Sequence, residues 1–79
     1  MSYKNIVQEY CQKHKIAVPW YTTERIGGND HLPEWRSSVK MFDRNFSSIG
    51  NTKTIAETNT AKLINEYINE NKIVKDKQY

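Results

Sequence analysis

The sequence predicts an α+β fold in two layers, with a three-stranded antiparallel sheet and two helices packed on one of its faces. Apolar residues recur at helical spacing near each end of the chain, which indicates one amphipathic helix at each end. Between them, residues 35–42 alternate apolar and polar side chains, as a strand with one buried face does. The order α-β-β-β-α follows, because two helices and one sheet bury their apolar sides against each other.

The first helix is expected over residues 3–14, with Ser2 as its N-cap. Its apolar stripe repeats at helical intervals and comprises Tyr3, Ile6, Val7, Tyr10, Cys11 and His14. The opposite stripe is polar and comprises Asn5, Gln8, Glu9 and Gln12. Pro19 prevents the helix from continuing, because the residue before a proline disfavours helical backbone.

Three strands are expected next. Residues 20–26 are rich in aromatic and β-branched side chains, and residues 27–33 form a loop too long for a two-residue hairpin. Residues 35–42 form the second strand, and one face of it carries Trp35, Ser37, Val39 and Met41. Turn-forming residues at 43–45 then lead into a short third strand at 46–49.

A second helix is expected to begin after Thr52, which is a good N-cap, and to end near Asn71. Its apolar stripe comprises Ile55, Ala56, Thr60, Leu63, Ile64, Tyr67 and Ile68. We therefore expect one domain over residues 1–70, followed by a charged tail at 71–79 that is flexible.

Composition limits the possible chemistry. Seventy-nine residues with 37% apolar side chains can bury one small core. Cys11 is the sole cysteine, so no internal disulfide is possible, and no second Cys/His pair could join Cys11 and His14 around a zinc ion. No apolar run is long enough to cross a membrane. We expect a soluble, intracellular protein, located in the cytoplasm, with no cofactor and no small-molecule substrate.

The net charge of +3 is concentrated near the C-terminus. Residues 71–79 carry a net charge of +2, whereas residues 1–70 hold nine basic and eight acidic groups. Bulk charge therefore does not decide whether the chain binds a polyanion, and any such binding depends on where individual cations and polar groups lie.

Four short motifs occur in a recognisable order. They are VQEYCQK at residues 7–13, PWY at 19–21, GNDHLPEW at 28–35 and GNTKTIAETNTA at 50–61. Together they resemble the double-stranded RNA-binding domain family over residues 3–68. The third motif departs from the family pattern G-P-x-H-x-x-x-F at two positions, where Asn29 replaces the proline and Trp35 replaces the phenylalanine.

The resemblance implies a three-part contact with A-form RNA, in which two minor grooves and the major-groove phosphates between them are bound. The first helix would contribute Asn5, Gln8, Glu9 and Gln12, and the loop after the first strand would contribute Asp30 and His31. The last helix would contribute Thr52, Lys53, Thr54 and the position of Glu57. Backbone N–H groups of Asn51 to Thr54 would also bind phosphate, as helix N-termini do.

The last motif lacks two of its expected cations. The family pattern has lysine at the positions of Thr54 and Glu57. Because both lysines are absent here, the motif predicts modest RNA affinity. Glu57 follows Lys53 by one helical turn, so one alternative is that these two side chains pair with each other. Changing Thr54 and Glu57 to lysine is then expected to tighten binding.

Two functions remain open at this stage. The first is binding of double-stranded RNA by its shape, with little sequence preference. The alternative is a domain of the same fold that binds a protein partner or a second copy of itself through its sheet edge and the aromatic residues Trp20, Trp35 and Tyr67. An enzyme is not expected, because the sequence offers no nucleophile with a base and no metal-binding constellation.

Overall fold

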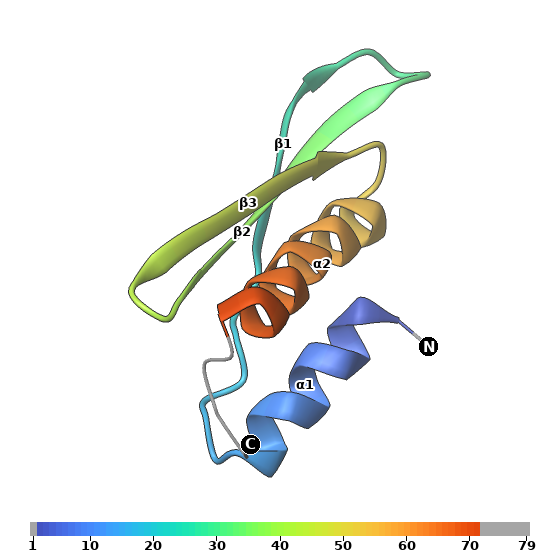
Figure 1. Cartoon of the computed structure of the whole chain (residues 1–79). Coiled ribbons are helices and arrows are strands. Elements are labelled where there is room, and N and C mark those ends of the chain that lie inside the picture. Colours follow the sequence, from blue (N-terminus) through green and yellow to red (C-terminus); the bar gives the residue numbers. More distant parts are fainter. Residues whose placement is uncertain (1, 72–79) are drawn as a thin grey trace.

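The computed structural model describes residues 2–71 and has the predicted order of elements. These are α1 (Tyr3–Lys13), β1 (Thr22–Gly28), β2 (Pro33–Met41), β3 (Arg44–Gly50) and α2 (Lys53–Asn71). The strands are antiparallel in the order β1-β2-β3, and both helices lie on the same side of the sheet (Figure 1). The two-layer α+β fold is therefore confirmed. The tail predicted at 71–79 lies outside the described residues, except that α2 extends to Asn71.

Side-chain caps define where both helices begin. The hydroxyl of Ser2 accepts a hydrogen bond from the backbone N–H of Asn5 at 3.2 Å, and the hydroxyl of Thr52 accepts one from Ile55 at 3.0 Å. Each cap satisfies one of the backbone donors that a helix N-terminus leaves unpaired. Both predicted N-caps are confirmed.

α1 ends before Pro19, and the proline is not what ends it. Lys15 has a left-handed backbone with φ of 58°, and the N–H of Ile16 donates to the carbonyl of Cys11 at 2.8 Å. This six-residue hydrogen bond around a left-handed residue is a Schellman motif, which terminates helices. The predicted limit of 3–14 was therefore nearly right, but the proline does not set it.

The core lies between the helices and the sheet. Its buried apolar residues are Val7, Cys11, Val39, Met41, Phe46, Ala61, Ile64 and Ile68. The Cys11 side chain is fully buried, and this burial raises the pKa of its thiol. The hydroxyl of Thr60, also fully buried, lies 3.1 Å from the Ser37 carbonyl and 3.0 Å from the Ala56 carbonyl. The predicted apolar stripe of α2 is wrong at Ile55 and Leu63, which are 44% and 39% exposed.

The β2–β3 turn lies one residue earlier than the sequence predicted. Met41 pairs with Arg44, and the two residues between them, Phe42 and Asp43, both have φ of 57°. Such a two-residue turn matches the twist of an antiparallel pair but normally favours asparagine or glycine. Phe42 is tolerated there because its ring packs against the core and against Tyr67, with 5.7 Å between ring centroids.

Candidate RNA-binding surface

The polar stripe of α1 faces solvent. Asn5, Gln8, Glu9 and Gln12 are all exposed. Val7 and Cys11, on the opposite side of the helix, are buried in the core. Amide and carboxylate groups at these positions can donate to and accept from hydroxyl groups without adding net positive charge. This chemistry matches the 2′-hydroxyls and base edges that a minor groove of RNA displays.

The loop between β1 and β2 is shorter than predicted. Gly27 and Gly28 extend β1, Pro33 begins β2, and only residues 29–32 connect the strands. Gly28 has φ of +81°, and a Cβ at this position would lie 2.2 Å from the Leu32 carbonyl oxygen. Glycine is therefore required for the loop to close so tightly.

Asn29 holds this loop in shape. Its side-chain oxygen accepts hydrogen bonds from the backbone N–H groups of His31 at 2.9 Å and Leu32 at 2.8 Å. The guanidinium of Arg25 donates to the Asn29 carbonyl at 3.1 Å. The Asn29 side chain thus restrains the loop through hydrogen bonds, whereas a proline at this position would restrain it through its ring. Asp30 and His31 are both exposed at the tip of this ordered loop.

The N-terminus of α2 combines backbone donors with one cation. Asn51, Thr52, Lys53 and Thr54 are all exposed. The Lys53 ammonium lies over the ring of Trp35, 5.1 Å from its centroid, so the tryptophan attracts and steadies this charge. A Cβ on Gly50 would lie 2.6 Å from the backbone nitrogen of Ala56, so glycine lets the chain pass close to the helix tip.

Glu57 does not pair with Lys53, and that alternative is wrong. The ammonium of Lys4 lies 2.6 Å from one oxygen of the Glu57 carboxylate, and the hydroxyl of Thr23 donates to the other at 2.7 Å. The hydrogen bond from Lys4 is the largest cause that lowers the pKa of Glu57, while partial burial opposes it. Lys53 also lowers this pKa through its charge, without forming an ion pair. Lys53 is therefore left available to a phosphate.

Sequence reasoning missed Lys4, Thr23 and the contact between Lys53 and Trp35. Lys4 lies 53 residues from Glu57 along the chain, and Thr23 lies 34 residues from it. No local periodicity connects positions so far apart. The only signal was the unusual residue itself, an acid where the resembled pattern has a lysine.

The three predicted contact segments lie on one side of the molecule. In Figure 1 the β1–β2 loop, the N-terminal end of α2 and the N-terminal end of α1 follow one another from top to bottom along the same side. The ten predicted site residues come from these segments and from the rest of α1, and all ten are exposed.

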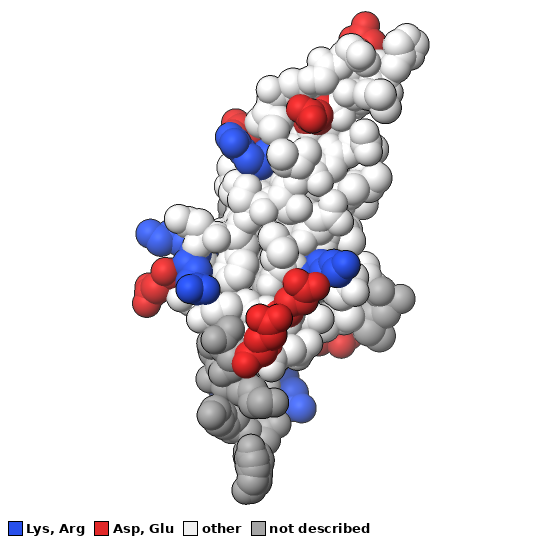
Figure 2. Space-filling view, turned by 45° about the horizontal axis from the view of Figure 1, so that its top comes forward, with Lys and Arg blue, Asp and Glu red and all other residues white. Residues whose placement is uncertain are grey.

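Charges of both signs are mixed on the face shown in Figure 2. Lysine and arginine side chains are scattered singly or in small groups, and most have acidic neighbours. Much of this face is uncharged. A ligand would therefore meet scattered cations among acidic and uncharged residues here, and not a continuous basic patch.

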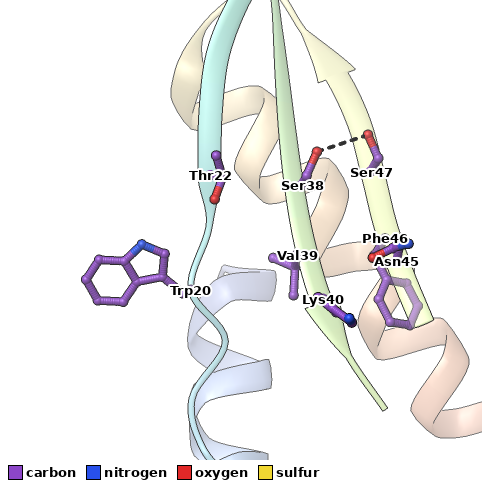
Figure 3. Close-up of a pocket in the computed structure, with 8 residues that line it drawn as sticks. All are labelled: Trp20, Thr22, Ser38, Val39, Lys40, Asn45, Phe46 and Ser47. Carbon is purple, nitrogen blue, oxygen red and sulfur yellow. Dashed lines mark hydrogen bonds between the residues drawn. The ribbon is translucent and has the colours of Figure 1, made fainter. Parts of the chain in front are cut away.

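The sheet also has a second face, which neither helix of the described chain covers (Figure 3). The Trp20 ring projects away from the strands and is 86% exposed. It borders a shallow hollow whose lining is Trp20, Thr22, Ser38, Val39, Lys40, Asn45, Phe46 and Ser47. Of the other aromatic residues predicted for partner binding, Trp35 and Tyr67 are partly buried.

Within residues 2–71, no three His, Cys, Asp or Glu side chains come close enough together to hold a metal ion. Neither helix in this range is long and apolar enough to cross a membrane.

Comparison with known proteins identifies the family. The family model described as "Double-stranded RNA binding motif" matches residues 3–76. The chain belongs to this family. A double-stranded RNA binding motif is a binding domain, and the resemblance inferred from the four motifs is confirmed.

Relatives of this domain occur within larger proteins. The chain is 39% identical over 64 residues to Double-stranded RNA-binding protein 1 of Oryza sativa subsp. japonica, matching 80% of this chain and 14% of that protein. It is also 39% identical over 61 residues to Ribonuclease 3 of Leptospira interrogans, matching 76% of this chain and 25% of that protein. The chain thus spans a quarter or less of the length of these relatives.

Solved structures show the same fold. The solution structure of both dsRBDs of DRB4 with their linker has a TM-score of 0.68 and 35% identity, and the match covers 86% of this chain and 44% of that chain. The isolated second dsRBD of DRB4 has a TM-score of 0.66 and 34% identity, with coverage of 87% and 97%.

Proposed function

We propose that this domain binds double-stranded RNA by its shape, with modest affinity and little sequence preference. The observation that carries the proposal is that three exposed polar segments lie on one side of the fold (Figure 1). In this arrangement α1 enters one minor groove, the β1–β2 loop enters the next, and the N-terminus of α2 meets the phosphates between them. Family membership supports the same function.

Each segment contributes a different kind of contact. Asn5, Gln8, Glu9 and Gln12 hydrogen-bond to 2′-hydroxyls and base edges, and Asp30 and His31 do so in the second groove. Backbone N–H groups of Asn51 to Thr54 bind phosphate together with the ammonium of Lys53. Because only one lysine stands at the helix tip, the salt dependence of binding should be shallow.

Duplexes of RNA and DNA with the same sequence test this proposal. A length of about 20 base pairs is sufficient, because domains of this family span about 16. Titration at low and at moderate salt should show binding to RNA and much weaker binding to DNA, which lacks 2′-hydroxyls. Equal binding to both duplexes, or binding to neither, would contradict the proposal. Gln8→Ala and His31→Ala should each weaken RNA binding, whereas Ser47→Ala on the opposite sheet face should not.

The second candidate is a docking surface on the uncovered sheet face. It is favoured by Trp20, which is 86% exposed beside the hollow, and by the outer edges of β1 and β3, which pair with no further strand among residues 2–71. A second copy of the chain would bind there. Light scattering should then detect a dimer that Trp20→Ala abolishes and that RNA does not affect.

We propose that residues 1–70 form one domain; the tail predicted at 71–79 lies almost entirely outside the described residues. We propose that the domain performs no chemistry itself, so that any catalysis on bound RNA comes from elsewhere. We place it inside the cell, in the cytoplasm, where its single free cysteine, Cys11, stays reduced.

A further inference from the structure

We propose that Glu57 is a positioning residue for RNA binding, which holds α1 in register with the N-terminus of α2. This inference rests on the proposed RNA-binding function and adds to it a role for an acidic residue at a place where the resembled motif has a lysine. The role is carried out through Lys4 and Thr23, and Glu57 itself does not need to touch RNA.

Glu57 is the centre of a polar junction that joins four elements. Its carboxylate binds Lys4 of α1 at 2.6 Å and Thr23 of β1 at 2.7 Å. The Thr23 hydroxyl lies 3.4 Å from that of Ser37 in β2, and the Lys4 ammonium lies 5.1 Å from the centroid of the Tyr21 ring. We call these five residues the Glu57 junction.

The junction is partly withdrawn from water. The side chains of Glu57 and Lys4 are only 20% and 39% exposed. Charge-assisted hydrogen bonds in such surroundings are stronger and more directional than ion pairs on an open surface. A pair with this geometry can therefore determine how two elements sit against each other.

α1 needs such a device, because its backbone lies close to that of α2 and farther from the strands. The contact between the helices is mainly apolar, with Val7 and Cys11 of α1 in the same cluster as Ala61, Ile64 and Ile68 of α2. Apolar contacts have little directional preference, so they leave a helix some freedom to rotate or slide. The directional hydrogen bond from Lys4 to Glu57 restricts that freedom at the N-terminal end of α1.

The junction lies next to two of the three proposed contact segments. Lys4 directly precedes Asn5 and is one helical turn before Gln8, while Glu57 is one turn after Lys53. The ion pair therefore links the polar stripe of α1 with the phosphate-binding tip of α2. Groove spacing in A-form RNA is fixed, so the relative position of these two segments determines whether both can bind at once.

The geometry reverses the expectation drawn from the motif alone. Replacing Glu57 with lysine adds positive charge, which by itself favours binding to a polyanion. It also places a second ammonium beside Lys4, where like charges repel and the hydrogen bond from Thr23 loses its acceptor. If position matters more than charge, Glu57→Lys weakens RNA binding.

Exchanging the charges of Lys4 and Glu57 separates the effect of helix position from the effect of net charge. The test measures affinity for the RNA duplex, and its dependence on salt, in Glu57→Lys, in Lys4→Glu and in the double variant Lys4→Glu/Glu57→Lys. The double variant has the net charge of the unchanged protein and can re-form the pair in reverse. Each single variant should lose about fivefold or more in affinity, equivalent to about 1 kcal/mol, and the double variant should recover most of the loss.

Thr23→Val provides a neutral second variant. It removes the hydrogen bond to Glu57 without changing charge, so it remains informative if the single charge variants fail to fold. It should weaken RNA binding while leaving the salt slope unchanged, because no phosphate contact is lost. Backbone amide signals should show that RNA still shifts the N-terminus of α2 but perturbs α1 less than in the unchanged protein.

The outcomes distinguish this proposal from the function on which it rests. If the unchanged protein does not bind the RNA duplex, the proposed function fails and the positioning role fails with it. If the unchanged protein binds, but Glu57→Lys binds more tightly or the double variant recovers nothing, only the positioning role is overturned.

Discussion

The Lys53 ammonium lies 5.1 Å from the centroid of the Trp35 ring. Its acidic neighbour one turn along α2, Glu57, forms an ion pair with Lys4 instead. A cation over an aromatic ring keeps its charge and remains accessible on its other side. Lys53 can thus meet a phosphate without first breaking an ion pair. The substitution of tryptophan for phenylalanine at position 35 helps to place this cation.

Lys53→Ala should lower RNA affinity about fivefold and reduce the salt slope by about one unit, because one phosphate contact is removed. Titrations at several salt concentrations measure both quantities. Lys40→Ala is the matched control, since Lys40 is also exposed but lines the hollow on the other sheet face. Equal effects of the two substitutions would show that only net charge matters and that the tip of α2 makes no specific contact.

Asn29→Ala should loosen the β1–β2 loop, because the N–H groups of His31 and Leu32 lose their acceptor. Exchange of these two amide hydrogens with solvent should accelerate, and RNA affinity should fall several-fold as the loop loses its preformed shape. Asn29→Asp keeps the acceptor oxygen and serves as the control. Unchanged exchange in Asn29→Ala would mean that the backbone alone maintains the loop.

Sequence-based prediction failed at individual residues with an unusual backbone conformation. Lys15, Phe42 and Asp43 adopt positive φ, although none is glycine. Propensity assigns such conformations to glycine or asparagine, so Phe42 was predicted to belong to a strand. Its actual place in a turn depends on packing against Tyr67, which lies in another element and leaves no local pattern in the sequence.

At the scale of elements, the buried hydroxyl of Thr60 connects α2 to the central strand. Thr60→Val removes a donor that lies 3.1 Å from the Ser37 carbonyl and 3.0 Å from the Ala56 carbonyl while nearly preserving volume. We expect a loss of about 1–2 kcal/mol in the free energy of unfolding, measured by chemical denaturation. Thr60→Ser retains the donor and should lose less. No loss in Thr60→Val would show that the hydroxyl does not stabilise the contact between α2 and β2.

The elements themselves were predictable because each carries its own periodic pattern. The alternation in residues 35–42 correctly placed Ser37, Val39 and Met41 on the buried face of β2, and the caps Ser2 and Thr52 correctly marked two helix starts. Loop boundaries were predicted less well. Gly27, Gly28 and Pro33 suggest a loop by composition, but pairing between β1 and β2 incorporates all three into strands.

At the scale of the whole molecule, one ion pair joins residues that are 53 positions apart. The ten predicted site residues could be chosen from motifs, since exposure follows from helix faces and loop tips. The Glu57 junction could not be predicted from the motifs, because it depends on how the fold places α1 and α2 relative to each other. A motif comparison treats Glu57 as a lost cation, whereas the structure shows it as a structural link between helices.

The same link makes the stability of the molecule depend on pH. The pKa of Glu57 is lowered from its ordinary value of 4.5, chiefly by the hydrogen bond from Lys4. Thr23 and the charges of Lys4 and Lys53 act in the same direction, and partial burial opposes them. A lowered pKa in the folded state means that the stabilisation is fully present above the unfolded value of 4.5. It is lost as the pH falls through the lower folded value.

Glu57→Gln tests this directly, because glutamine mimics the protonated acid in size and polarity. At neutral pH the unchanged protein should be more stable than the variant, and this difference should shrink below pH 4.5 and vanish once Glu57 is protonated. Denaturation curves for both proteins between neutral pH and about pH 2 measure the difference. A stability difference that persists unchanged at low pH would show that the carboxylate charge does not hold α1 in place.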